Sequence, residues 1–122
     1  MAGLVPGDEV ITPACTFSTT VAPLCQLQLV PVFCDVIVRT VVPSVDQVME
    51  KITSKTKAIF VPNLAGSKPN WAELRMRCEA IGRRDICLIE DSCDTMTHTV
   101  ESDMSIISSV GPHYQERFQP RY

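Results

Sequence analysis

The sequence has no run of apolar residues near the roughly 20 that cross a bilayer, and no basic stripe of the kind that neutralises nucleic-acid phosphates. Its first ten residues, MAGLVPGDEV, lack the basic stretch and the apolar stretch of an export signal. Charges of both signs are scattered along the chain and sum to −3. These absences argue against nucleic-acid and membrane partners and predict a soluble, cytoplasmic protein.

The cysteines lack the C-x-x-C spacing that many zinc and redox sites use, so we expect no metal site. With no export signal, and with several of them inside apolar runs, they are expected to be reduced and buried rather than paired in disulfides. The six are Cys15, Cys25, Cys34, Cys78, Cys87 and Cys93.

What the chain does have is apolar sequence. Of its 122 residues 45% are hydrophobic, which is enough for one domain, or part of one, with a real core. Short apolar runs recur, each closed by polar or turn residues, as in strands that are buried on both faces. They are Glu9–Thr12, Leu29–Phe33, Ala58–Val61 and Ile86–Ile89, with a further candidate at Met104–Ser108.

Helical signals separate these runs. The clearest helix is predicted over Asn70–Ile81, where Asn70 is the N-cap, Glu73 is its capping partner three residues on, and Gly82 closes the last turn.

Two further helices are predicted between the earlier runs. Val45–Ile52 carries an apolar stripe and has Ser44 as its cap, with Gln47 at the capping-box position. Ser18–Gln28 is a weaker candidate because Pro23 would interrupt it unless it fell in the first turn. Strands that alternate with helices predict an α/β fold, a mostly parallel sheet flanked by helices.

Ligands of such sheets bind beyond the carboxyl ends of the strands, so the residues that follow each strand are the candidates for function. The sequence contains no G-x-G-x-x-G turn and no G-x-x-x-x-G-K-S/T loop, which excludes two common nucleotide-binding loops. The candidate segments are Thr12–Thr19, Cys34 and Asp35, Asn63–Ser67, Asp91–Asp94 and Ser108–His113.

Three segments, in this order, resemble the DegT/StrS family of pyridoxal-phosphate-dependent nucleotide-sugar aminotransferases and dehydrases. The resemblance implies that residues 1–113 are part of the large, cofactor-binding domain of an aminotransferase-like (fold type I) protein, with a divergent, disordered tail over residues 114–122. It also implies pyridoxal phosphate or pyridoxamine phosphate as the cofactor. The segments are Gly7–Leu24 followed by Pro31–Val36; Thr56–Arg75; and Leu88–Met96 leading to Ser102–His113.

Asp91 and Phe17 match the positions that hold the cofactor ring in this family. Asp91 ends the run LIED, where the family's carboxylate pairs with the pyridine nitrogen and keeps it protonated, so that the ring can accept electrons. Phe17, in TFSTT, matches the aromatic side chain that stacks on the ring. Without the resemblance, Asp91 could equally cap a helix and Phe17 could belong to the core.

Two polar residues match weaker family positions. Asp94 falls where relatives carry a polar group near the phenolic oxygen of the cofactor, although it could also be a solvated loop carboxylate. Ser108 matches a serine that binds the cofactor phosphate, but a serine at a strand end can equally cap a turn.

His113 stands where the family's aminotransferases carry the lysine that holds the cofactor covalently. The resemblance therefore points to the subgroup of dehydrases that remove the 3-hydroxyl of a nucleotide-linked 4-keto-6-deoxyhexose with pyridoxamine phosphate. There the histidine takes a proton from the exocyclic carbon of the cofactor, work that suits an imidazole with an ordinary pKa of about 6.5. Taken alone, His113 could be a surface histidine beside a loose tail. Two stretches, Leu64–Trp71 and Glu90–Asp94, are also closer to the dehydrases than to the aminotransferases.

The chain also departs from the family. Family members are several times longer, and residues 114–122 match nothing in them. We therefore expect a fragment of an enzyme of deoxysugar and lipopolysaccharide biosynthesis, inactive alone, from a truncated gene or an incomplete gene model. Its implied partners are a nucleotide-linked sugar and a second copy in a homodimer. The alternatives are a fragment of a nucleotide-sugar aminotransferase, a non-catalytic subunit that pairs with an intact paralogue, and an unrelated α/β binding protein.

Overall fold

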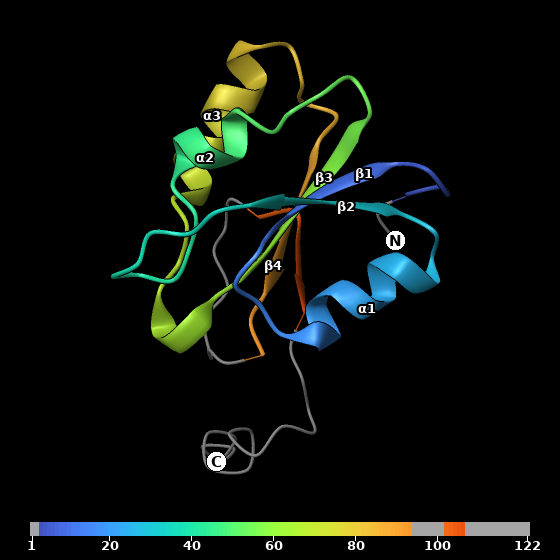
Figure 1. Cartoon of the computed structure of the whole chain (residues 1–122). Helices are drawn as coiled ribbons and strands as arrows, with labels where there is room; N and C mark the ends of the chain where they lie inside the picture. The colour runs from blue at the N-terminus through green and yellow to red at the C-terminus, as the bar shows by residue number, and fades with distance from the viewer. Residues whose placement is uncertain (1–2, 94–101, 107–122) are drawn as a thin grey trace, which may run out of the picture.

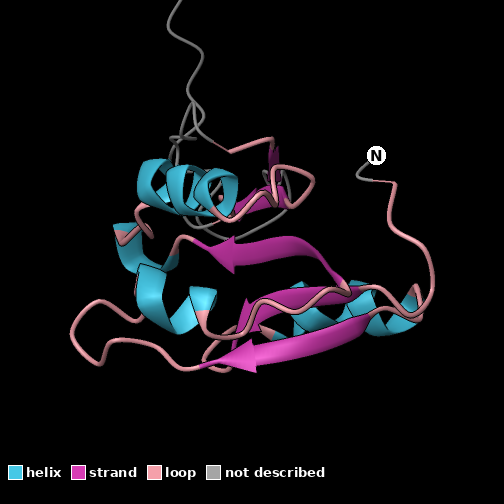
Figure 2. Cartoon of the chain, turned by 90° about the horizontal axis from the view of Figure 1, so that it is seen from above, coloured by secondary structure: helices cyan, strands magenta, loops and turns pink. Residues whose placement is uncertain are grey.

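A five-stranded sheet forms the centre of the computed structural model, which describes residues 3–93 and 102–106. Its strands lie in the order β2-β1-β3-β4-β5, and every neighbouring pair is parallel. The strand arrows open to view in Figure 2 accordingly point in the same direction. The predicted α/β fold is confirmed. In chain order the elements are β1 (Glu9–Pro13), α1 (Ser18–Gln26), β2 (Val30–Cys34), α2 (Val45–Met49), β3 (Thr56–Pro62), a 3-10 turn (Leu64–Gly66), α3 (Trp71–Ala80), β4 (Cys87–Asp91) and β5 (Met104–Ile106).

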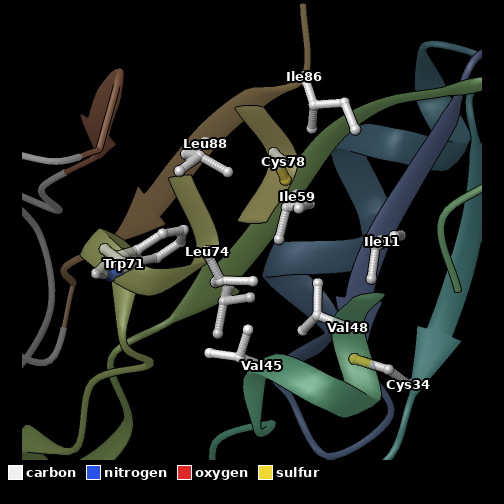
Figure 3. Packing of buried hydrophobic residues seen from close by; sticks show 11 residues of the cluster. Ile11, Cys34, Val45, Val48, Ile59, Trp71, Leu74, Cys78, Ile86 and Leu88 are labelled. Carbon is white, nitrogen blue, oxygen red and sulfur yellow. The ribbon is translucent and has the colours of Figure 1, made fainter. Parts of the chain in front are cut away.

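Helices cover both faces of the sheet. Figure 1 shows α1 on one side and α2 with α3 on the other. On the α2 and α3 side, Trp71, Leu74 and Cys78 of α3 point toward the sheet residues Ile59 and Leu88 (Figure 3), and all five side chains are buried. On the α1 side a smaller cluster joins α1 to the same strands: Val10, Leu24, Leu29, Ala58, Phe60 and Ile89. The central strands β1, β3 and β4 are therefore buried from both sides, as their apolar runs predict. The prediction is wrong for the run Leu29–Phe33, because β2 lies at the edge of the sheet and its Val30 and Phe33 are exposed.

The capping signals hold two helices in place. Ser44 Oγ accepts a hydrogen bond from Gln47 N at 3.2 Å, and Gln47 Oε1 accepts one from Ser44 N at 2.8 Å, which makes a complete capping box for α2. At the start of α3, Asn70 Oδ1 accepts from Glu73 N at 3.2 Å, while Asn70 Nδ2 donates to Glu73 Oε2 at 3.1 Å. Both predicted helix starts are confirmed.

Two helix predictions need correction. The predicted helix over Val45–Ile52 ends at Met49, because Ile52 N donates to Met49 O at 3.2 Å in a tighter turn. Ile52 still packs against the core, so the apolar pattern of the sequence predicts which side chains face the core even beyond the end of the helix. In α1, Pro23 does not interrupt the helix, which runs through it to Gln26. Pro23 lies on the exposed side, where a helix can bend outward around the ring.

The predicted fifth strand and the tail fall partly or wholly outside the described residues. Met104–Ile106 is a strand, paired with β4, and residues 107–108 of the predicted run lie outside the described residues. The tail over residues 114–122 lies outside them as well. Within the described part of the chain, no helix combines the length and apolar character needed to cross a membrane.

All six cysteines are free thiols, but the prediction that they are buried is wrong for half of them. Cys34 and Cys78 are buried and Cys87 is intermediate, whereas Cys15, Cys25 and Cys93 are exposed. Cys15 and Cys93 follow the ends of β1 and β4, and Cys25 lies on the exposed side of α1. Burial raises the pKa of the Cys34 thiol to about 11 and also raises the pKa of Cys78 and Cys87.

We expect a thiol reagent at pH 8 to label Cys15, Cys25 and Cys93 rapidly, and Cys34 and Cys78 only after unfolding. The thiolate is the reactive form, and the two buried thiols remain protonated and shielded at this pH. Stopped-flow labelling with Ellman's reagent, followed by peptide mass mapping, measures this. Rapid labelling of Cys34 in the folded chain would contradict the packing of β2 against α2.

Candidate functional site

The strand order creates a topological switch point at β1, where successive chain connections lead to opposite sides of the strand. From β1 the chain moves to β2 on one side, and then returns to β3 on the other side of β1. In open parallel sheets, ligands bind beyond the carboxyl ends of the strands at such a switch point. The residues that follow β1 and β3, together with those that end the neighbouring β4, are therefore the first place to look for a site.

A small hollow lies at this place, and we call it the strand-end hollow. Its volume is about 40 Å³. Its lining comes from three strand ends that are far apart in the sequence: Phe17 and Thr19 after β1, Pro62 and Asn63 at the end of β3, and Asp91 and Cys93 at the end of β4.

Phe17 presents an aromatic face at this hollow. It is the N-cap residue of α1, with an extended backbone (φ −75°, ψ 146°) that turns the chain from β1 into the helix. Its side chain is 57% exposed although it is large and apolar. An aromatic ring left open beside a hollow offers a flat surface on which another ring can stack.

Asp91 is held by hydrogen bonds on both carboxylate oxygens. Oδ2 accepts from the hydroxyl of Thr20 at 3.1 Å, and Oδ1 accepts from the backbone amide of Cys93 at 3.2 Å. Its main-chain oxygen accepts from Asn63 N at 2.9 Å, which ties the end of β4 to the residue after β3. A carboxylate can accept about four hydrogen bonds, so Asp91 retains the capacity to accept one from a cationic N–H in the hollow.

A second carboxylate, Glu90, points to the other face of the sheet and is completely buried. Its Oε1 accepts from Asn63 Nδ2 and lies 3.5 Å from Lys68 Nζ, and its Oε2 accepts from the Ser102 hydroxyl at 3.1 Å. The amide of Asn63 also donates to Ser92 Oγ at 3.2 Å. This network, which we call the Glu90 cluster, ties Asn63, a lining residue of the strand-end hollow, to the buried end of β4.

A larger groove lies away from the strand-end hollow, on the side of α2 and α3. Its volume is about 330 Å³, and we call it the α2/α3 groove. It lies where the loop after β2 meets the starts of these two helices, and its lining is Ile37, Thr40, Val42, Pro43, Ser44, Val45, Asp46, Lys68, Pro69, Asn70 and Glu73.

The structure brings together two of the five residues singled out in the sequence, Phe17 and Asp91, which line the same hollow. The other three, Asp94, Ser108 and His113, lie outside the described residues. No group of three or more His, Cys, Asp or Glu side chains within residues 3–93 and 102–106 is arranged to hold a metal ion.

The sequence pattern does not predict the contacts of Thr20, Asn63 or Glu90. Asn63 was within a strand-end segment, so its position was indicated but not its contacts. The sequence does give an indication for Glu90, because a charged residue inside an otherwise apolar strand must find partners when it is buried. It gives no indication for Thr20, because a hydroxyl on a helix shows no preference for a partner 71 residues away.

The sequence of residues 1–111 matches the DegT/DnrJ/EryC1/StrS aminotransferase family. The chain is 41% identical over 96 residues to GDP-4-keto-6-deoxy-D-mannose 3-dehydratase of Escherichia coli O55:H7, covering 79% of this chain and 24% of that protein. It is 38% identical over 98 residues to dTDP-4-dehydro-2,6-dideoxy-D-glucose 3-dehydratase of Saccharopolyspora spinosa, covering 80% of this chain and 21% of that protein.

A solved structure gives a similar match. NtdA from Bacillus subtilis, with bound PMP, superposes with a TM-score of 0.79 at 31% identity, covering 88% of this chain and 25% of NtdA. The chain thus spans between a fifth and a quarter of the length of the curated relatives it matches.

Proposed function

The chain belongs to the DegT/DnrJ/EryC1/StrS aminotransferase family, and from this premise we propose that its sheet binds the ring of pyridoxamine phosphate or pyridoxal phosphate between Phe17 and Asp91. The observation that carries the proposal is the convergence of these two side chains, 74 positions apart, on the strand-end hollow. A stacking surface and a carboxylate at the switch point of a parallel sheet are the two features that a protonated pyridine ring requires.

The two lining residues would act on different parts of the ring. The pyridine ring would stack on the exposed aromatic side chain of Phe17. The Asp91 carboxylate, held by the Thr20 hydroxyl and the Cys93 amide, would accept a hydrogen bond from the ring nitrogen.

When bound, the cofactor supplies an electron-accepting ring. The part of Asp91 is to hold a proton at the ring nitrogen, and the part of Phe17 is to fix the plane of the ring and cover one side of it from water. Asp94 would lie near the phenolic oxygen and Ser108 would hold the phosphate. His113, two residues beyond the family match, would be the base that moves a proton at the exocyclic carbon.

For the whole protein we propose removal of the 3-hydroxyl from a nucleotide-linked 4-keto-6-deoxyhexose. Two observations support this over amino transfer: both curated relatives described above are 3-dehydratases, and residue 113 is histidine rather than the cofactor-binding lysine. Since the chain spans at most a quarter of those relatives, we propose that it contributes the ring-binding part of the site. The remaining groups would come from further sequence and from a second copy in a homodimer.

Replacing Phe17 by alanine is expected to weaken binding of pyridoxamine phosphate by about two- to twelvefold, because stacking between aromatic rings is worth about 0.5–1.5 kcal/mol. The pyridoxamine form is the probe because, unlike the aldehyde, it does not react with surface lysines. Isothermal titration of the chain measures the dissociation constant.

Phe33→Ala is the matched control for this experiment. Phe33 is also exposed, at 47%, but lies on the edge strand β2 and not at the hollow. Its replacement should leave the dissociation constant unchanged. Equal weakening by both variants, or tight binding that survives Phe17→Ala, would refute the role of Phe17.

A further inference from the structure

The hydrogen bond between Thr20 and Asp91 connects two parts of the site that share no strand pairing. Asp91 ends β4, whereas Thr20 follows β1, and β3 lies between these two strands. The Thr20 hydroxyl reaches past the end of β3 and donates to Asp91 Oδ2 at 3.1 Å.

Thr20 also lies in the same helical turn as the aromatic residue. Its backbone amide donates to Phe17 O at 3.0 Å, so the first turn of α1 fixes the separation between the two residues. The Thr20 side chain is 1% exposed, and a β-branched side chain has few χ1 rotamers open to it in a helix. The hydroxyl is therefore held on a rigid element rather than on a loop.

The second donor to the Asp91 carboxylate lies in the turn that directly follows Asp91. Cys93 N binds Oδ1 from within the segment that carries Asp91, so it would move with that segment. The Thr20 hydroxyl is the donor that comes from a separate element, and it sets the direction of the carboxylate relative to α1 and Phe17.

We propose that Thr20 is a positioning residue, whose hydroxyl aims the Asp91 carboxylate at the nitrogen of a ring stacked on Phe17. The inference rests on the proposed function, because it names a residue that acts on the same site through Asp91. Without the hydroxyl, the carboxylate would rotate about its side-chain bonds, and its hydrogen bond to the ring nitrogen would lose alignment.

The test compares Thr20→Val, which keeps the shape but removes the hydroxyl, with Thr20→Ser, which keeps the hydroxyl. Thr56→Val is the matched control, because Thr56 is also fully buried and its hydroxyl accepts one hydrogen bond, from Thr53 N, at the opposite end of the sheet. Two measurements are made on each full chain: the ¹³Cγ resonance of Asp91 without cofactor, and the dissociation constant of pyridoxamine phosphate, corrected for the folded fraction.

We expect Thr20→Val to shift the Asp91 ¹³Cγ resonance and to weaken binding about three- to tenfold, the effect of one hydrogen bond. Thr20→Ser should restore both values, and Thr56→Val should change neither, although it lowers stability. An unchanged Asp91 resonance in Thr20→Val would overturn the proposal, as would a dissociation constant for Thr20→Val equal to that of a wild-type chain that binds.

The two measurements also separate this proposal from the proposed function. If the wild-type chain fails to bind pyridoxamine phosphate while Thr20→Val still shifts the Asp91 resonance, ring binding by this chain is refuted and the positioning of the carboxylate stands. If the wild type binds and Thr20→Val binds equally well, the proposed function stands and the role of Thr20 is refuted.

Discussion

Replacing Asp91 by asparagine is expected to weaken binding of pyridoxamine phosphate by about 10- to 100-fold. Asparagine has nearly the same shape but cannot carry the negative charge that pairs with a protonated ring nitrogen. A hydrogen bond to a charged group contributes about 1.5–3 kcal/mol, and every 1.4 kcal/mol corresponds to a factor of about ten in the dissociation constant. Isothermal titration of the full chain measures this loss.

The control for this variant makes the same change of charge elsewhere. Asp46→Asn removes an exposed carboxylate that pairs with Arg77 on the surface, outside the strand-end hollow. Exposed pairs contribute only about 0–1 kcal/mol to stability, so the control should fold and bind like the wild type. A dissociation constant for Asp91→Asn within a factor of two of the wild-type value would rule out the ring-nitrogen role of Asp91.

Replacing Glu90 by alanine is expected to lower the free energy of unfolding by about 3–5 kcal/mol, the cost of breaking a buried ion pair. The substitution removes the carboxylate that accepts from Asn63 and Ser102 and lies beside Lys68. It also leaves a space in a fully buried position. Because domains of this size have total stabilities of about 5–15 kcal/mol, this loss is large. Urea denaturation followed by circular dichroism measures it.

Glu79→Ala provides the comparison for the Glu90 variant. Glu79 pairs with Arg84 at 3.5 Å, but both side chains are exposed to solvent. Its replacement should change stability by less than about 1 kcal/mol. If Glu90→Ala also cost less than about 1 kcal/mol, the Glu90 cluster would not be what holds the loop after β3.

The fold was predictable because each central strand is buried on both faces. Val10 lies in the same buried cluster as Leu24 of α1, and Ile11 lies in the same buried cluster as Val48 of α2. Both positions are therefore apolar, and the strand appears as a continuous run. The order of the strands could not be predicted in this way. A run that is apolar throughout does not indicate which strands lie next to it, and β1 lies between β2 and β3 although β2 directly follows it in the chain.

The candidate site was predictable only in part. The rule that ligands lie beyond strand ends, together with the family resemblance, indicated Phe17 and Asp91, and the structure places both at one hollow. One of the two hydrogen bonds that hold the Asp91 carboxylate comes from α1, a helix whose start the sequence left uncertain because of Pro23. The pattern of side chains along a helix gives the face that is buried, but not the partner of one buried hydroxyl.

The most direct test of ring binding at the strand-end hollow is a titration of the ¹⁵N-labelled chain with pyridoxamine phosphate, followed by backbone amide chemical shifts. We expect the largest changes at Phe17, Thr19, Asn63, Asp91 and Cys93, which line the hollow. Changes centred instead on the α2/α3 groove, or saturation with no change at Phe17 and Asp91, would contradict the account.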